Sequence, residues 1–247
     1  MTGRFVARFA VAIALHALVG VAVAQAPETG PFDLLLRTNV KAGHVHYPGF
    51  QDAPALKSYL TELAKPVKLD TKAEQLAYNI NAYNAFAIQG ILDGLSPSSF
   101  IGRQRYFKLQ EWPLAGRRIS LHDLEHAVLR PLGDPRMHFA IICASKSCPF
   151  LRSEAYTAAK LDAQLDEQAR QFVNDPSRNR FDKATKTAHL SEIFKWFDED
   201  FRGAGSVQKY VAKYVDDTDV ARSLSSDAYR VEWIPYDWNL NGTPPRR

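Results

Sequence analysis

Two cysteines, the only ones in the chain, stand five residues apart in the stretch HFAIICASKSCPF, residues 138–150. Cys143 ends an apolar run, and a cysteine there can act as a nucleophile when a neighbouring base removes its proton. Two cysteines at this spacing can also close a small disulfide loop in an oxidising compartment. The pair therefore leaves open a reactive thiol at Cys143 or a Cys143–Cys148 disulfide, and it is weak evidence for a metal site.

The segment LHDLEHAVLRPL, residues 121–132, carries an acid and an imidazole side by side. Its apolar spacing predicts a helix with Glu125 on the buried stripe, where a carboxylate needs a partner. We expect Cys143 as nucleophile, His126 as its base and Glu125 as the group that orients the histidine. His138 is a poor candidate for the base, because an expected strand over residues 136–143 points it away from the thiol. Alternatively, Glu125 only bonds a backbone amide or an arginine.

The same helix contains HDLEH, which matches the H-x-x-E-H pattern of one class of zinc hydrolases. His122 and His126 would stand one turn apart, and Glu192 or Glu199 could complete the site. Five-residue matches arise by chance, and His122 lies toward the solvent side of the expected helix. A zinc hydrolase is therefore a second alternative, and the leading hypothesis includes neither a metal nor another cofactor.

Two asparagines and two arginines are the remaining polar candidates. Asn81 and Asn84 stand beside the apolar stripe of a helix predicted near residues 72–93, where asparagine is a poor helix former. Their amides would either fasten loop backbone or polarise a substrate. Arg130 and Arg136 would bind an anionic group of the substrate. We expect a small-molecule or peptide-like substrate.

Several predicted elements must position these side chains. Helical spacing and capping residues predict helices that start at Pro31, at residues 53–65, 72–93 and 121–132, after Thr157, at 191–201 and at 206–215. Hairpins are expected at residues 106–119 and 179–190, and strands at 136–143 and 229–238. This mixture has no βαβ rhythm, so we predict a single α+β domain, with helices packed on a small mixed or antiparallel sheet.

The first 24 residues are typical of a secretory signal. Arg4 and Arg8 precede an apolar run of about sixteen residues, shorter than the ~20 of a membrane span, and small residues follow at Ala22–Ala24. We predict cleavage after Ala24 and an exported, periplasmic protein with no stable membrane span.

The ends of the remaining chain are expected to be loose. Residues 25–38 are predicted to form a flexible lead-in and the first helix, and residues 242–247 a disordered tail. The chain carries 31 basic and 27 acidic residues, and no basic tract interleaves with aromatic residues. We therefore expect no nucleic-acid partner.

Five segments, in order, resemble the family called domain of unknown function 547: INAYNAFAI, ISLHDLEHAVLRP, DPRMHFAIICASKSCPFLRSEAYTA, LSEIFKWFDEDF and YDWNLN. The resemblance spans about residues 39–241 and implies an exported bacterial member, but no established activity. The positions marked in the family correspond here to Asn81, Tyr83, Asn84, Glu125, His126, Arg130, His138, Cys143 and Cys148.

The resemblance also bears on the alternatives. In the family the first cysteine is stricter than the second, which argues against a disulfide as the whole explanation of Cys143. His122 stands where the family typically has an acidic residue, which weakens the zinc hypothesis. Our leading hypothesis is a thiol-dependent hydrolase or acyl transferase of the cell envelope. Its rival is a non-catalytic envelope binding module with a structural Cys143–Cys148 disulfide.

Overall fold

Helix α3 (Lys72–Leu92) is the axis around which the first part of the molecule is built. The computed structural model describes residues 25–246, so the predicted signal segment lies outside the described residues. Thr71 and Glu74 close a reciprocal capping box at the start of α3, and nearly every side chain from Leu76 onward is buried. A helix buried all round explains how Asn81 and Asn84 come to lie in the core.

The fold is α+β, as predicted. The helices are α1 (Gly30–Asn39), α2 (Pro54–Leu63), α3, α4 (Phe100–Arg103), α5 (Leu121–Asp123), α6 (Leu161–Val173), α7 (Glu192–Trp196), α8 (Asp198–Phe201), α9 (Val207–Ala212) and α10 (Thr218–Ser225). The strands are β1 (Val40–Lys41), β2 (His44–His46), β3 (Glu111–Leu114), β4 (Arg117–Ser120), β5 (Arg180–Asp182), β6 (Thr187–Ser191), β7 (Arg230–Ile234) and β8 (Gly242–Thr243). They form the small sheets β1-β2-β8, β3-β4 and β5-β6-β7.

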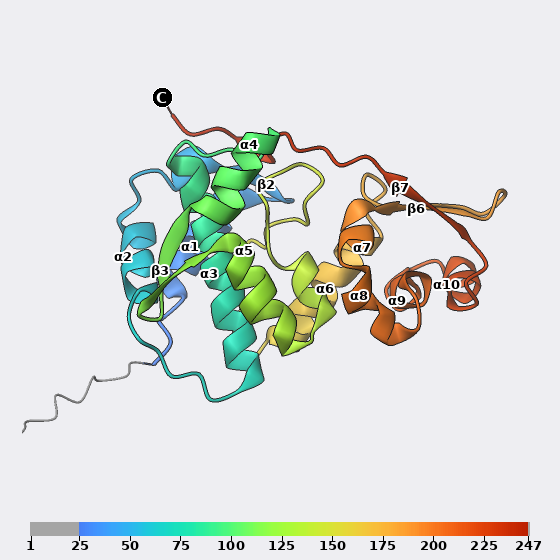
Figure 1. Ribbon diagram of the computed structural model, residues 1–247, viewed down its shortest axis with the longest axis horizontal. Coiled ribbons are helices and arrows are strands. Elements are labelled where there is room, and N and C mark those ends of the chain that lie inside the picture. The colour runs from blue at the N-terminus through green and yellow to red at the C-terminus, as the bar shows by residue number, and fades with distance from the viewer. Residues whose placement is uncertain (1–24, 247) are drawn as a thin grey trace, which may run out of the picture.

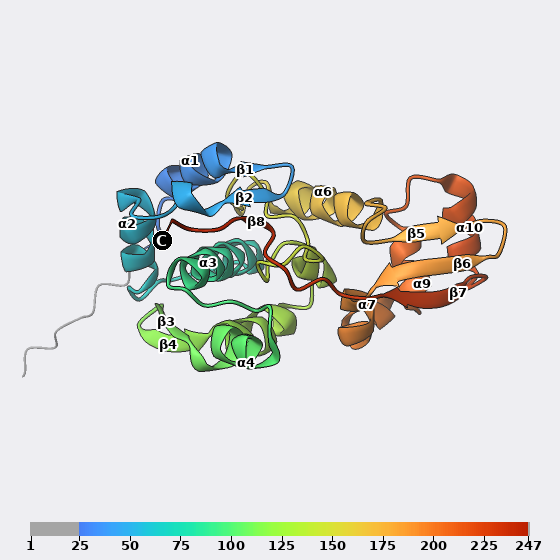
Figure 2. The same ribbon diagram turned by 90° about the horizontal axis from the view of Figure 1, so that it is seen from above.

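The body is elongated and has two ends (Figures 1 and 2). One end holds α3 between α1 with β1 and β2 on one side and the β3-β4 hairpin with α4 on the other. The opposite end holds β5, β6 and β7 with α7 to α10. Two clusters of buried apolar side chains match these ends, and the segment Phe139–Ile141 passes from the second cluster to the first.

The strand predicted over residues 136–143 is wrong. The chain forms a 3-10 turn, Pro135–Phe139, capped by Asp134, and continues without a strand partner. Asn84 replaces the missing partner: its amide donates to the carbonyl of Ala140 at 2.9 Å and accepts from the N–H of Ile142 at 3.0 Å. An apolar run with no polar alternation does not distinguish a central strand from a buried turn held by side chains.

Other predicted elements are confirmed or shifted. The hairpin at 179–190 forms as β5 and β6, and β7 joins it in parallel. In the first hairpin, β4 is as expected, but the first strand is β3, because residues 104–109 form a π-helical turn. Ser120 caps the helix that follows, which widens into a π-helical turn over Leu124–Leu129. Thr157 opens only the turn before α6.

The C-terminal segment returns from β7 along the body and ends beside α2 (Figure 2). The expected disordered tail is ordered at its start, because β8 pairs with β2. The main chain of Asp237 and Asn239 accepts hydrogen bonds from Ser147 and Lys146, so this segment straps the loop that follows Cys143. Within residues 25–246, no helix is long and apolar enough to cross a membrane.

Candidate functional site

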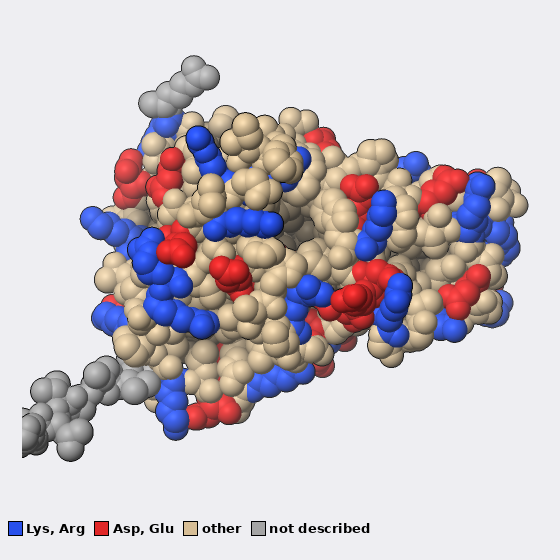
Figure 3. Space-filling view, viewed as in Figure 1, with Lys and Arg blue, Asp and Glu red and all other residues tan. Residues whose placement is uncertain are grey.

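A pocket of about 260 Å³ opens between the two ends of the body. Figure 3 shows the surface hollowed between the positions that α4 and α7 occupy in Figure 1. Its polar lining consists of Tyr83, Arg103, Gln104, Lys108, His122, Glu125, His126, His138, Cys143, Cys148 and Tyr236, and its apolar wall includes Phe100, Phe107, Ile141, Trp196, Phe197 and Trp238. The pocket therefore brings the predicted cysteine, glutamate and histidine to one cavity.

The backbone turns sharply directly after Cys143. Ala144 adopts a left-handed conformation with φ of +57°, which is uncommon for a residue with a Cβ and typical of functional turns. Its carbonyl accepts the N–H of Asn241 in the C-terminal strap. The turn takes the chain away from the cavity and leaves the Cys143 side chain in the lining.

The sulfur of Cys143 contacts two hydroxyl groups. Its Sγ lies 2.9 Å from Oγ of Ser145 and 3.0 Å from the hydroxyl oxygen of Tyr236. Burial alone would raise the pKa of Cys143, but hydrogen bonds from Cys148, Ser145 and Tyr236 lower it to about 7. Hydrogen bonds to the charged form favour that form, so the surroundings stabilise a thiolate.

Cys148 lies directly behind Cys143. The N–H of Cys143 donates to the Cys148 sulfur at 2.7 Å, and both cysteines are free thiols in this structure. Burial holds the pKa of Cys148 well above its usual range, so its thiol stays protonated beside the Cys143 sulfur. The structure presents the reduced pair, and the Cys143–Cys148 disulfide stays a prediction.

His126 does not have the properties of a base. Its Nδ1 lies 2.9 Å from a guanidinium nitrogen of Arg130, and a guanidinium only donates. The proton of the neutral ring therefore lies on Nε2, which makes that nitrogen a donor. Burial, then the neighbouring His122 and Arg130, lower the pKa of His126 to about 4. The predicted base role is corrected because Arg130, one helical turn on, occupies the acceptor nitrogen.

His138 lines the same pocket as Cys143 and Glu125. It is buried in the lining, and its Nε2 donates to Asp200 at 2.7 Å. Asp200 also binds Arg130 through two nitrogen–oxygen contacts of 2.7 and 2.9 Å, and its pKa lies far below its usual range. The lone pair of His138 is therefore on Nδ1, which faces Glu125 with 3.7 Å between nitrogen and carboxyl oxygen. The strand argument against His138 fails, because the chain forms a 3-10 turn there, but its ring contacts Asp200 and Glu125 rather than the Cys143 sulfur.

Glu125 is a protonated acid at neutral pH. Burial is the main cause and the negative charge of Cys143 the next, and together they raise the pKa of Glu125 to about 8, although Arg130 opposes the shift. Two negative charges in one cavity cannot both be stabilised, so a thiolate at Cys143 favours the neutral carboxyl. The site therefore holds one negative charge on sulfur and one proton on Glu125.

The two asparagines are occupied by backbone groups. Asn81 donates to the carbonyl of Tyr156 at 2.8 Å and accepts its N–H at 2.9 Å, in the same way that Asn84 holds residues 140 and 142. Both amides bind backbone and neither lines the pocket, so the substrate-binding role expected for them is not carried forward. Asn84 instead positions the segment that leads to Cys143.

The two arginines are paired as well. Arg136 binds Asp134, Asp162 and Asp166, each with a nitrogen–oxygen contact of 2.8 Å, and it does not line the pocket. Arg130 is held by Asp200 and His126. Their expected role as anion-binding groups is replaced by a role in fixing neighbouring side chains.

The zinc alternative has no ligand set in the described part of the chain. His122 and His126 lie with their ring centroids 4.2 Å apart and their planes tilted by 47°. Nowhere in residues 25–246 do three or more histidine, cysteine, aspartate or glutamate side chains converge as metal ligands. Zinc needs three or four ligands, and the guanidinium on His126 opposes a cation there.

Sequence reasoning did not identify Ser145, Asp200 or Tyr236 as site residues. Asp200 reaches His138 across 62 positions, and Tyr236 reaches Cys143 across 93. No spacing rule connects residues so far apart. The interaction of His126 with Arg130 did have a signal, because the two residues are four apart on a predicted helix.

Part of this chain matches a known protein family. Residues 66–173 match the family described as "Protein of unknown function, DUF547". The matched segment contains Glu125, His138 and Cys143, whereas Asp200 and Tyr236 lie beyond it. Neither the curated proteins nor the solved structures give a match to this chain. The segment at residues 66–173 therefore belongs to the DUF547 family of proteins of unknown function.

Proposed function

We propose that this protein is a thiol-dependent hydrolase or acyl transferase with Cys143 as its nucleophile. The observation that carries the proposal is the Cys143 sulfur, which lies in a largely apolar pocket, contacts two hydroxyls and has a pKa lowered to about 7. Reactive cysteines sit in such partly enclosed, thiolate-stabilising surroundings. The signal-like first 24 residues support export to the cell envelope as part of the same proposal.

In the proposed reaction, the thiolate of Cys143 attacks an acyl carbonyl carbon and forms a sulfur–carbon bond. The protonated Glu125 gives its proton to the leaving group as the carbonyl–leaving-group bond breaks, which yields a thioester and a carboxylate. Water or an acceptor alcohol or amine then gives a proton to Glu125 and attacks the thioester. The product leaves, and Cys143 returns as a thiolate beside a protonated Glu125.

Two histidines have different parts in this proposal. His126 lines the pocket with a hydrogen on Nε2, so it can donate to the oxyanion that forms on the carbonyl oxygen. His138, fixed by Asp200, presents a lone pair toward Glu125 and orients its proton. The distance of 3.7 Å is a contact rather than a hydrogen bond, so His138 is a positioning residue.

Alkylation tests the nucleophile directly. Treat residues 25–247 with iodoacetamide across pH 5–9 and locate the modified residue by mass spectrometry. Cys143 should react with a midpoint near pH 7, and at neutral pH about tenfold faster than an unperturbed thiol. Cys148→Ala should still be alkylated at Cys143, but with a midpoint at higher pH, because the hydrogen bond from Cys148 is the largest contribution that lowers the pKa of Cys143.

A panel of activated esters and thioesters tests the reaction class. Hydrolysis should be lost in Cys143→Ala and kept, at reduced rate, in Cys148→Ala. Protein purified from its native compartment decides between the enzyme and the binding-module hypothesis. A Cys143 that resists alkylation because it is bonded to Cys148, with no turnover after reduction, would favour the binding module.

A further inference from the structure

An exposed apolar and basic surface lies beside the mouth of the pocket, on α4 and the π-helical turn Gln104–Leu109. The exposed fractions of Phe100, Ile101 and Leu109 are 70 %, 67 % and 72 %. They are three of five large apolar side chains with exposure of this order among the described residues. A fourth, Trp196 at 43 %, lines the same pocket and stacks on Trp238 with ring centroids 5.7 Å apart. Large apolar groups gathered at one site mark an interaction surface.

The charged side chains of this surface are all positive. Residues 94–110 contain Arg103, Arg105 and Lys108 and no acidic residue. None of the three cations forms an ion pair within residues 25–246; Arg103 lies over the ring of Trp238 at 4.6 Å. Figure 3 shows tan surface flanked by blue side chains over α4, next to the hollow. The partner of this surface must therefore be apolar and anionic.

We propose that α4 and the turn 104–109 dock the protein on an anionic lipid bilayer, with the pocket mouth at the membrane surface. Interfacial segments combine phenylalanine, leucine and tryptophan with lysine and arginine in this way, and the cations attract anionic headgroups. The aromatic side chain of Trp238, which packs against Arg103, and that of Trp196 beside it suit the headgroup region. This inference goes beyond the proposed chemistry and does not depend on it.

Vesicle sedimentation with residues 25–247 tests the docking surface, because that form contains the described fold and lacks the apolar run 1–24. The triple variant Ile101→Ser, Arg105→Gln, Leu109→Ser removes two exposed apolar groups and one cation, none of which lines the pocket. Vesicles with phosphatidylglycerol should bind the unsubstituted protein, and the variant should bind about tenfold more weakly or less. Binding should fall at high salt.

A matched control removes similar groups elsewhere. Leu34→Ser with Lys57→Gln takes away an apolar side chain that is 65 % exposed on α1 and an exposed cation on α2. This variant should bind anionic vesicles normally, and both variants should keep the alkylation of Cys143. Equal binding by the triple variant and the control would overturn the proposal. So would equal binding to phosphatidylcholine alone, or dimerisation lost in the triple variant.

Discussion

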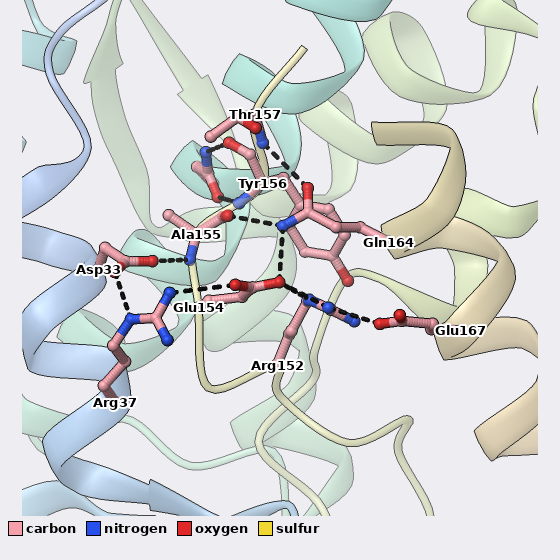
Figure 4. Close-up of polar contacts among 10 residues, drawn as sticks. Asp33, Arg37, Arg152, Glu154, Ala155, Tyr156, Thr157, Gln164 and Glu167 are labelled. Atoms are coloured by element: carbon pink, nitrogen blue, oxygen red, sulfur yellow. Dashed lines mark hydrogen bonds and ion pairs between the residues drawn. The ribbon is translucent and has the colours of Figure 1, made fainter. Parts of the chain in front are cut away.

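Two polar clusters that each contain a largely buried glutamate differ in their electrostatics. The site cluster consists of Glu125, His126, His138, Cys143 and Asp200. The anchor cluster, drawn in Figure 4, ties α1 and α6 to the loop at 152–157 and consists of Asp33, Arg37, Arg152, Glu154, Gln164 and Glu167. Each contains a glutamate that burial alone would favour in its neutral form. The two glutamates nevertheless end in different protonation states.

The pKa values of the two glutamates differ because their neighbouring groups differ. In the anchor cluster, burial would raise the pKa of Glu154, but hydrogen bonds from Gln164 and Arg152 lower it to about 2. In the site cluster, burial and the Cys143 charge act together and raise the pKa of Glu125 to about 8. A carboxylate paired with a guanidinium stays ionised and stabilises the fold, whereas a carboxyl group beside a thiolate stays protonated. The paired charges of the anchor cluster therefore indicate a structural role. The perturbed glutamate and cysteine of the site cluster indicate a candidate for catalysis.

The largest effect is expected from Glu125→Gln, measured as the free energy of unfolding in urea between pH 4 and pH 9. Folding raises the pKa of Glu125 from 4.5 to about 8, so the folded state binds the extra proton between those values. The wild-type protein should lose stability as pH rises through this window, by roughly 3–5 kcal/mol. The variant has no such proton and should lack that loss, so it should be the more stable protein at pH 8.5.

Glu154→Gln is the matched control, and its effect should have the opposite sign. Folding lowers the pKa of Glu154 from 4.5 to about 2, so its contribution is present above pH 4.5 and is lost as pH falls toward 2. The variant should be less stable than wild type at pH 7 by about 2 kcal/mol. If both substitutions destabilise at pH 8.5, the contrast between the clusters is wrong.

The two asparagines of α3 allow the clusters to be tested separately. Asn81 holds backbone beside the anchor cluster, and Asn84 holds backbone beside the site cluster. Asn81→Ala leaves two backbone groups of Tyr156 unpaired beside the anchor cluster, and Asn84→Ala leaves Ala140 and Ile142 unpaired beside the site. Each should cost about 3 kcal/mol of unfolding free energy. Only Asn84→Ala should slow alkylation of Cys143, because only that amide positions the segment before the thiol. Equal slowing in both would mean that the effect is general loosening.

Local sequence signals predicted several of the helices that carry the two clusters. The long helix at residues 72–93 and the caps at Ser120 and Ser191 follow from periodicity and capping chemistry, and they are present. The candidate residues Glu125 and Cys143 were found because a carboxylate on an apolar stripe and a cysteine after an apolar run are locally unusual. They do lie in one cavity.

The division of roles within the site was not predictable in this way. His138 was set aside on the alternation of a strand, whereas the chain there is a 3-10 turn held by Asn84. The partner Asp200 comes from a distant helix, α8, so only the tertiary fold brings it to His138. Tertiary contacts determine which ring nitrogen of each histidine carries the proton. For His126 a local signal also existed, because Arg130 stands four residues later on the same predicted helix.

The smallest effect is expected within the anchor cluster, from two arginines that bind the same carboxylate. The Arg152 side chain is 16 % exposed and binds Glu154 at 2.6 Å, whereas Arg37 is 54 % exposed and binds it at 3.1 Å. Arg152→Gln should lower the free energy of unfolding by about 2 kcal/mol, because it removes the less exposed of the two guanidinium partners of a mostly buried carboxylate. Arg37→Gln should give no measurable change, since exposed ion pairs are screened by water and salt.

Both arginine variants should leave the pH midpoint for alkylation of Cys143 unchanged, which urea titration and mass spectrometry together can establish. A shift of that midpoint in Arg152→Gln would mean that charge in the anchor cluster is felt at the thiol. Unfolding losses of equal size in the two variants would mean that burial does not set the strength of these ion pairs. An unchanged midpoint together with unequal losses would confirm that the anchor cluster serves the fold and that the thiolate depends on its immediate neighbours.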